Sequence, residues 1–192
     1  MNVIQSCACA IELGIDKNTV KRSFKALQNV KGRLEKAEAF KGRGFAVYID
    51  YAHTPDALSK LLDTAQSFKD GDQRVVLLFG CGGDREKQKR KIMGKIAVNQ
   101  ADFVIITSDN PRSEDPIEII NDILLGVGEN KNFTVIPDRR EAIEFAIANA
   151  KDGDIILLAG KGHEKYEINS RGVFPFDERE ILKNIEMRRN EI

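Results

Sequence analysis

An aspartate, an asparagine and an arginine stand close together in the segment Ser108-Asp109-Asn110-Pro111-Arg112. The oxygen atoms of the first two side chains are suited to hold an ammonium group. The arginine two residues on is suited to grip a carboxylate with two parallel hydrogen bonds. Arg85 and Glu164, in two other polar segments, would add a second carboxylate contact and a second ammonium acceptor. Because an amino acid carries both groups, these residue types predict an amino-acid site.

Polar segments of this kind follow apolar runs that are rich in β-branched residues. The runs lie at 45–50, 75–80, 103–108, 133–136 and 154–159, and the polar segments begin at Asp50, Gly80, Ser108, Pro137 and Gly160. Loops that precede the runs show no such enrichment. Open parallel sheets bind ligands outside the carboxyl ends of their strands. The sequence therefore predicts that these segments meet at one edge of a sheet and form a polar ligand site.

Amphipathic helical patterns separate the apolar runs. They lie at 55–68, 86–100, 116–127 and 139–150, and Thr54 and Asp138 are the expected N-caps of the first and last. Near-continuous apolar strands that alternate with helices indicate a parallel sheet covered on both faces. Short runs at 166–168 and 173–176 predict a terminal hairpin or an antiparallel edge, and 177–189 a closing helix. The predicted fold class is a three-layer α/β domain with about five parallel strands plus an antiparallel edge.

The first residues of the chain have a different composition. Residues 2–13 are small and apolar, and they predict a buried helix. A second helix is expected after Asp16 or Asn18, with Val20, Phe24 and Leu27 on one apolar face. Residues 28–44 are rich in glycine and basic residues and show little periodicity, so a domain boundary is expected near Leu34.

Composition and charge exclude several classes of protein. The chain has 192 residues with 30 basic and 30 acidic side chains, and this balance argues against nucleic-acid or membrane-surface partners. We find no apolar run of the ~20 residues that span a bilayer and no secretory signal, which predicts a cytoplasmic protein. The three cysteines form no Cys-x-x-Cys pair, so reduced thiols and no metal site are expected.

Each candidate motif also has a plainer interpretation. Asp50 has the position of a cap for the following helix, and the glycines at 80–83 are typical of a tight turn. The pattern G-x-G-x-x-G fails because Arg85 stands at its third glycine, and no P-loop pattern occurs. His53 and His163 fit either a general-base pair or structural hydrogen bonds. The basic run at 87–91 is expected to be a solvated helix face.

Four strings in this order resemble a known family. They are DYAHTPDAL at 50–58, GCGGDREKQKR at 80–90, DNPR at 109–112 and AGKGHE at 159–164. Together they resemble the C-terminal domain of the Mur ligases, and the DNPR form is similar to that of the diaminopimelate-adding members. The resemblance implies a Rossmann-like fold for 34–192. It also implies that 1–33 are the last helices of a central ATP-binding domain, a helical stub whose remaining domains lie outside this chain.

The resemblance further implies a reaction. ATP would phosphorylate the terminal carboxylate of UDP-MurNAc-L-Ala-D-Glu, and the amine of meso-diaminopimelate would attack the acyl phosphate. Mg²⁺ would be bound mainly by domains outside this chain, so the chain alone is expected not to turn over. By matching motifs, Arg33, Asp50 and His53 would bind ATP, and no catalytic residue is assigned. The amino acid would be bound by Arg85, Asp109, Asn110, Arg112, Gly160 and Glu164.

Two alternatives stay open at this point. One is a lysine-adding relative, although such members usually lack the arginine at the position of Arg112. The other is a non-catalytic domain that binds an amino acid or a nucleotide. A departure from the family also bears on ATP: Gln5 stands where asparagine is usual, at a position expected to contact adenine.

Overall fold

The computed structural model describes residues 2–26 and 30–190. Contacts within the chain divide it into two compact units, 1–30 and 31–192. The second unit thus begins a few residues before Leu34.

The first unit consists of two helices. They are α1 (Asn2–Glu12) and α2 (Lys17–Ala26). The carboxylate of Asp16 begins α2, because it accepts hydrogen bonds from the backbone N–H groups of Asn18 and Thr19. The prediction that the first helix is buried is wrong in this chain, since Ile4 and Ile11 of α1 are 72% and 39% exposed. Within this unit α2 is the partner of α1, and one helix cannot cover more than one face of another. Leu27 lies outside the described residues.

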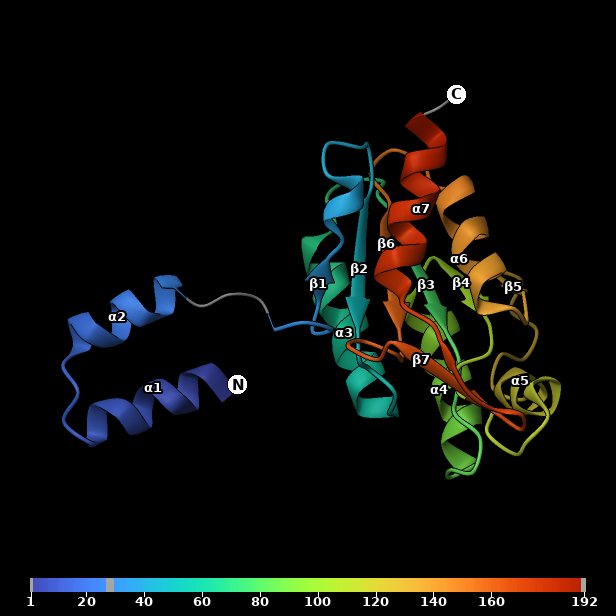
Figure 1. The fold of residues 1–192 in the computed structure, drawn as a ribbon, viewed down its shortest axis with the longest axis horizontal. Coiled ribbons are helices and arrows are strands. Elements are labelled where there is room, and N and C mark those ends of the chain that lie inside the picture. The colour runs from blue at the N-terminus through green and yellow to red at the C-terminus, as the bar shows by residue number, and fades with distance from the viewer. Residues whose placement is uncertain (1, 27–29, 191–192) are drawn as a thin grey trace. The chain divides into compact units, whose positions relative to one another are not determined.

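The second unit is built on a six-stranded sheet with the order β1-β2-β6-β3-β4-β5 (Figure 1). Its strands are β1 (Glu35–Lys36), β2 (Ala46–Asp50), β3 (Val75–Phe79), β4 (Phe103–Ile106), β5 (Phe133–Val135) and β6 (Ile155–Ala159). All neighbours are parallel except β1, which runs antiparallel to β2. The five predicted parallel strands are therefore confirmed.

The sheet has an antiparallel edge, as expected. This edge is β1, whose two residues carry no apolar signal in the sequence. Of the two alternatives predicted for the runs near the C-terminus, the hairpin is confirmed, because β7 (Tyr166–Asn169) pairs with β8 (Gly172–Pro175) in a two-stranded sheet of its own.

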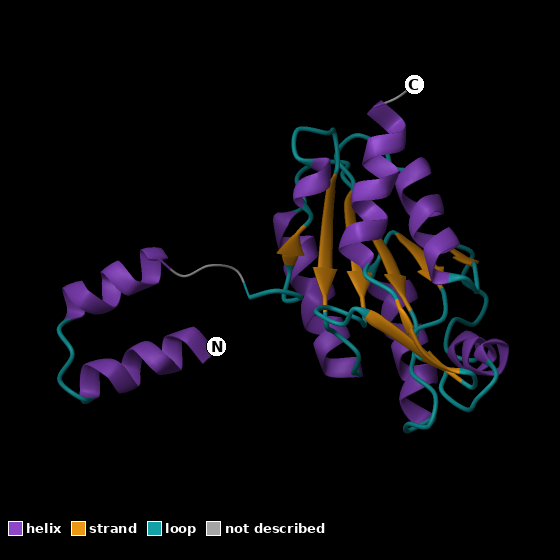
Figure 2. Cartoon of the chain, viewed as in Figure 1, coloured by secondary structure: helices purple, strands orange, loops and turns teal. Residues whose placement is uncertain are grey.

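Helices cover both faces of the sheet (Figure 2). On one face lie α3 (Pro55–Phe68), α4 (Gln88–Gln100) and α5 (Pro116–Leu124). On the other lie α6 (Arg139–Ala148), α7 (Glu178–Asn190) and the short 3₁₀ helix η1 (Glu38–Phe40). Thr54 and Asp138 cap α3 and α6 as predicted, each accepting from a backbone N–H three residues on. The three-layer arrangement is thus confirmed.

Alternate residues of the central strands point into two separate cores. Leu77 and Phe79 pack on the α3–α5 side, while Val76 and Leu78 pack on the α6–α7 side. All five residues of β3 are buried, and so are all five of β6. A strand buried on both faces must be apolar throughout, which explains the continuous apolar runs. None of the helices in the described residues is both long and apolar enough to cross a membrane.

The face of α4 that packs on the sheet and on α5 includes Met93, Gly94, Ala97 and Val98, whereas Ile92 is half exposed. Gly94 is buried because α4 and α5 approach so closely that a methyl group there would overlap the backbone carbonyl of Ile123.

This close approach reverses the usual effect of a glycine-to-alanine change in a helix. Alanine normally stabilises a helix interior by about 1 kcal/mol. We expect Gly94→Ala instead to destabilise the fold by about 1–3 kcal/mol, as overpacked cores do. Urea denaturation measures this. Asn99→Ala, at an exposed position of the same helix, is the control and should change stability by less than about 0.5 kcal/mol. A stabilised Gly94→Ala would contradict the helix contact.

Candidate functional site

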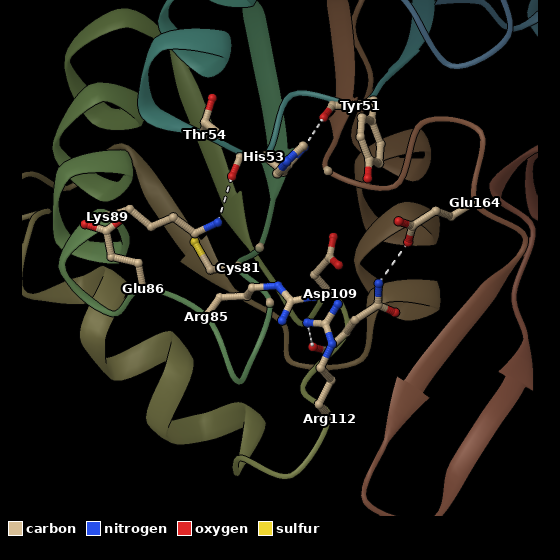
Figure 3. Close-up of a pocket in the computed structure, with 14 residues that line it drawn as sticks. Tyr51, His53, Thr54, Cys81, Arg85, Glu86, Lys89, Asp109, Arg112 and Glu164 are labelled. Atoms are coloured by element: carbon tan, nitrogen blue, oxygen red, sulfur yellow. Dashed lines mark hydrogen bonds between the residues drawn. The ribbon is translucent and has the colours of Figure 1, made fainter.

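A cavity of about 440 Å³ opens at the carboxyl ends of β2, β3, β4 and β6 (Figure 3). Its size falls within the range of small-molecule sites. Its lining residues are Tyr51, His53, Thr54, Gly80, Cys81, Gly82, Arg85, Glu86, Lys89, Asp109, Asn110, Arg112, Gly160 and Glu164. Four of the five predicted polar segments therefore meet at one edge of the sheet, and the segment after β5 does not reach the wall.

The structure brings together the predicted amino-acid-binding residues. Arg85, Asp109, Asn110, Arg112, Gly160 and Glu164 all line this cavity. The cavity carries both signs of charge, with a third basic side chain from Lys89 and a third acidic one from Glu86 (Figure 3). Such a wall is suited to a small zwitterion.

The structure places only one of the three residues predicted to bind ATP at the cavity wall. His53 lines the cavity, but Arg33 and Asp50 do not. Asp50 accepts hydrogen bonds from the backbone N–H groups of Ala52 (2.8 Å) and Leu34 (2.7 Å). The interpretation of Asp50 as a helix cap is therefore wrong, because Thr54 caps α3. The Arg33 guanidinium lies over the ring of Tyr51, 5.1 Å from its centroid.

Asn110 is buried, and both ends of its side-chain amide are hydrogen-bonded. The Oδ1 atom accepts hydrogen bonds from the Lys161 ammonium and from the backbone N–H of Ile168, both at 3.0 Å. The Nδ2 atom donates to Oε2 of Glu164 at 2.8 Å. The Asn110 oxygen thus holds an ammonium, as its type predicts, but the ammonium is that of Lys161.

Arg112 has an unusual backbone conformation, with φ of 54°. A non-glycine residue in this left-handed region costs free energy and has to be held in place. Its backbone N–H donates to the carbonyl of Ile168, and its Nη1 donates to the carbonyl of Gly83. These contacts hold the guanidinium at the cavity wall.

Gly160 makes room for the Asp109 carboxylate. Its φ is +118°, and a Cβ atom there would lie 2.5 Å from Oδ2 of Asp109. A side chain at this position would therefore push the carboxylate out of the cavity wall.

A buried ion pair lies behind the cavity and joins two strand ends. Arg139 donates to Oε1 of Glu178 through Nε and Nη2, at 3.0 and 2.8 Å. The same guanidinium donates to the carbonyls of Ala159 and Ser108, which end β6 and precede Asp109. Burial raises the pKa of Glu178, and Arg139 opposes that shift. This pair supports the segment that carries Asp109. Arg139 belongs to the polar segment predicted after 133–136, but its pairing with Glu178 was not predicted.

A second network holds the turn that carries Arg85. Arg90 is fully buried and donates to Glu114 through both terminal nitrogens, at 2.9 and 2.8 Å, and to Asp122 at 2.9 Å. Glu114 also accepts from the backbone N–H of Asp84 at 2.6 Å. The prediction of a solvated helix face at 87–91 is therefore wrong at Arg90. Its acidic partners lie 24 and 32 residues away, so no local pattern reveals them.

Other wall residues were not singled out in the sequence. The ring of Tyr51 lies 4.5 Å from that of His53 and 5.0 Å from that of His163, and burial raises the pKa of its phenol. Lys89 donates to the carbonyl of His53 at 3.0 Å. Both residues fall inside the strings at 50–58 and 80–90, which is the signal that would have found them.

The cysteines are all free, as expected. Burial raises the pKa of Cys81 to about 12, so its side chain at the cavity wall is a neutral thiol. Within the described residues, we find no group of three or more His, Cys, Asp or Glu side chains arranged to hold a metal ion.

Comparison with known proteins identifies the family. The family model described as "Mur ligase, glutamate ligase domain" matches residues 32–162, more than half of the chain. The chain belongs to the Mur ligase family.

Individual relatives agree with this family. The UDP-N-acetylmuramoyl-L-alanyl-D-glutamate–2,6-diaminopimelate ligase of Caldanaerobacter subterraneus subsp. tengcongensis is 49% identical over 185 residues, which are 96% of this chain and 37% of that protein. The ligase of the same name from Bacillus cereus is 46% identical over 182 residues, 95% of this chain and 36% of the relative. The chain thus spans little more than a third of the length of these Mur ligases.

Solved structures show the same relationship. A 2,6-diaminopimelate ligase of the same name has a TM-score of 0.76 at 35% identity, over 98% of this chain and 38% of that chain. The UDP-N-acetylmuramate–alanine ligase of Thermotoga maritima has a TM-score of 0.69 at 23% identity, over 99% of this chain and 37% of that chain. The second likeness shows a shared fold alone.

The Arg90–Glu114 contact in this Mur ligase domain predicts a pH dependence of stability. Hydrogen bonds from Arg90 lower the pKa of Glu114 to about 2, from an ordinary value of 4.5. A carboxyl whose pKa is lowered on folding stabilises the fold above its unfolded pKa and loses that contribution as the pH falls towards its folded pKa. The stabilisation is therefore present above pH 4.5 and is lost as the pH falls towards about 2.

Glu114→Gln tests this dependence. We expect the variant to be less stable at neutral pH and to lose less stability between about pH 5 and pH 2.5. Denaturant unfolding at each pH measures both effects. Glu38→Gln, at an exposed carboxylate, is the control, and its free energy of unfolding should fall with pH as steeply as that of the unsubstituted chain. If the free energy of unfolding of Glu114→Gln also falls as steeply, the contact does not form in solution.

Proposed function

We propose that this chain is part of an ATP-dependent ligase that adds meso-diaminopimelate to UDP-MurNAc-L-Ala-D-Glu in peptidoglycan synthesis. In this proposal residues 34–192 are the C-terminal, amino-acid-binding domain, and 1–33 are the last helices of the central ATP-binding domain. The observation that carries the proposal is the cavity of mixed charge, in which Arg85 and Arg112 lie with Asp109 and Glu164. The names of the relatives that match nearly the whole chain support the same reaction.

The reaction joins a carboxylate to an amine. A carboxylate is a poor electrophile, so the γ-phosphoryl group of ATP is first transferred to the terminal carboxylate of the muramoyl dipeptide, and ADP leaves. The neutral amine of the amino acid then attacks the acyl carbon and forms the amide bond. The bond from that carbon to the phosphorylated oxygen breaks, and phosphate leaves with this oxygen and takes up the proton that the amine loses. When bound, Mg²⁺ supplies charge neutralisation for the phosphates, and we assign it mainly to the domains outside this chain.

The task of the cavity is to align the attacking amine. Asp109 and Glu164 have the charge to hold an ammonium, and Arg85 and Arg112 have the charge to hold a carboxylate. Diaminopimelate carries a carboxylate at the far end of its side chain, and lysine does not. With lysine bound, the guanidinium of Arg112 would keep its carbonyl contact with Gly83 but would be covered without a carboxylate partner, which is costly. This difference favours diaminopimelate over lysine.

For ATP we assign Arg33 to the phosphates, and Asp50 with His53 to the ribose. Each oxygen of Asp50 accepts one backbone N–H. A carboxylate oxygen has two lone pairs, so each oxygen keeps one for a ribose hydroxyl. The ring of Tyr51 contacts both Arg33 and His53, which supports a common role for this group.

A chimera tests the reaction. The chain would replace the corresponding part of the Caldanaerobacter ligase, whose upstream part supplies the remaining domains. We expect phosphate release that requires ATP, the muramoyl dipeptide and meso-diaminopimelate together, with little release when lysine replaces the diamino acid. Lysine used equally well would point to a lysine-adding enzyme. No release with any diamino acid would favour a non-catalytic binding domain.

A second experiment tests selectivity at Arg112. We expect Arg112→Ala in the chimera to reduce kcat/KM for diaminopimelate by an amount equivalent to about 3–5 kcal/mol, because one partner of a covered ion pair is removed. Steady-state kinetics with each amino acid measures the loss. Arg171→Ala, at an exposed arginine in the turn between β7 and β8, is the matched control. Unchanged kinetics with diaminopimelate would remove Arg112 from the site.

A further inference from the structure

Lys161 is a fully buried lysine next to the cavity, and it does not line the wall. Its ammonium donates to Oδ1 of Asn110 and to the carbonyl of Tyr166, both at 3.0 Å. The same nitrogen lies 5.3 Å from the centroid of the Phe176 ring. A buried lysine is rare unless it is paired, because desolvation disfavours the charged form. A buried lysine beside a polar cavity is therefore a candidate for a functional role.

The surrounding charges compensate for part of that cost. Burial lowers the pKa of Lys161 and Arg139 adds to that shift, while the carboxylates of Asp109, Glu178 and Glu164 oppose it. Lys161 thus lies among three acidic groups, and two of them belong to the cavity wall.

The contact with Asn110 decides how that amide is oriented. Lys161 and the backbone N–H of Ile168 are both donors, and both point to the same side of the amide. Only the oxygen can accept from two donors, so the NH₂ group has to lie on the opposite side. A rotated amide would place three donors together.

On that opposite side the NH₂ group meets Glu164. It donates to Oε2 at 2.8 Å, and this bond is the dashed line that ends on the Glu164 carboxylate in Figure 3. One oxygen of Glu164 is thereby held at the protein. The carboxylate also interacts with the Tyr51 phenol. Because Glu164 lines the cavity, its remaining lone pairs are available to a ligand in a defined direction.

We propose that Lys161 is a positioning residue for amino-acid recognition, acting through the orientation of Asn110 on the ammonium acceptor Glu164. The relay runs from the Lys161 ammonium to the Asn110 oxygen, and from the Asn110 NH₂ group to Glu164. Its role in catalysis rests on the proposed ligase function. The relay itself rests on the contacts of the described residues.

The relay also has a second branch, which reaches the hairpin. Lys161 binds the carbonyl of Tyr166 in β7, and Ile168 of the same strand binds both Asn110 and the backbone N–H of Arg112. Removal of the lysine is therefore expected to loosen the ammonium acceptor and the DNPR segment together. ATP binding, assigned to Arg33, Asp50 and His53, lies outside these contacts.

The first arm of the test uses the chain itself and needs no activity. In ¹⁵N-resolved NMR spectra, the side-chain NH₂ protons of Asn110 should exchange slowly with water because one of them is bonded to Glu164. We expect Lys161→Met to speed their exchange at least about tenfold, since the amide oxygen then keeps the Ile168 N–H as its donor but loses the charge-assisted bond from the lysine. Lys183→Met, at an exposed lysine paired with Glu180, is the control and should have no effect. Unchanged exchange in Lys161→Met would overturn the relay.

The second arm uses the chimera. We expect Lys161→Met to raise KM for diaminopimelate about ten- to a hundredfold, the effect of one charge-assisted hydrogen bond, with KM for ATP changed less than about twofold. Equal increases in both KM values would indicate general loosening and overturn the positioning role. In an Asn110→Ala background, adding Lys161→Met should raise KM little further, because the lysine acts through that amide. Additive effects would contradict this route.

A third variant covers the case in which Lys161→Met does not fold. Asn110→Asp keeps an oxygen for Lys161 but replaces the NH₂ donor with an oxygen that repels Glu164. We expect a folded protein with a raised KM for diaminopimelate, and an unchanged KM would overturn the relay. If the unsubstituted chimera has no activity with any diamino acid, the ligase proposal fails, and the NMR arm still decides the relay.

Discussion

The arrangement of the whole sheet depends on the pairing of β6 with two neighbours. All five of its residues pair in parallel register with β2 on one side, and four of them pair with β3 on the other. Because parallel strands end at the same edge, the segment Gly160–Glu164 emerges between the segments that follow β2 and β3. Asp109 and Arg112 then follow from β4 on the far side of β3. The position of one strand therefore brings together cavity residues as far apart in the sequence as Tyr51 and Glu164.

The cavity is held by buried charges that do not themselves reach it. Lys161, Arg139 and Arg90 are each at most 3% exposed, and each is bound to carboxylate or carbonyl oxygens of the segments that form the wall. Burial of a charge is costly, so such contacts add little net stability. These contacts fix the orientation of the polar groups around them, because a buried cation allows few alternative arrangements of its partners. We infer that the desolvation cost of the buried cations is tolerated because it keeps the groups of the cavity wall oriented before the ligand binds.

The sequence allowed the parallel strands, the alternating helices and the two helix caps to be predicted, since each depends on neighbours a few residues away. It also allowed prediction of which segments are polar at the strand ends. The predictions that failed concern residues whose burial or pairing depends on parts of the chain far away in the sequence. Arg90 looks like a solvent-facing residue until Glu114 and Asp122 are placed beside it. The first helix looks buried by composition, but its apolar side chains are exposed in this chain. Asn110 has the chemistry of a ligand contact, but its oxygen is already occupied.

By itself the sequence determined the local features: the period of each element, the polar types after each strand and the four strings that mark the family. These follow from short-range backbone and side-chain preferences, which can be read in a single segment. Only the tertiary structure decided the strand order, with β6 between β2 and β3, and therefore which polar segments share a wall. It also decided which charged side chains are buried behind the cavity wall and hold it in place, and which ones line the cavity and are available to a ligand. The physical reason is that burial and pairing are properties of the assembled core, and no single segment contains both partners.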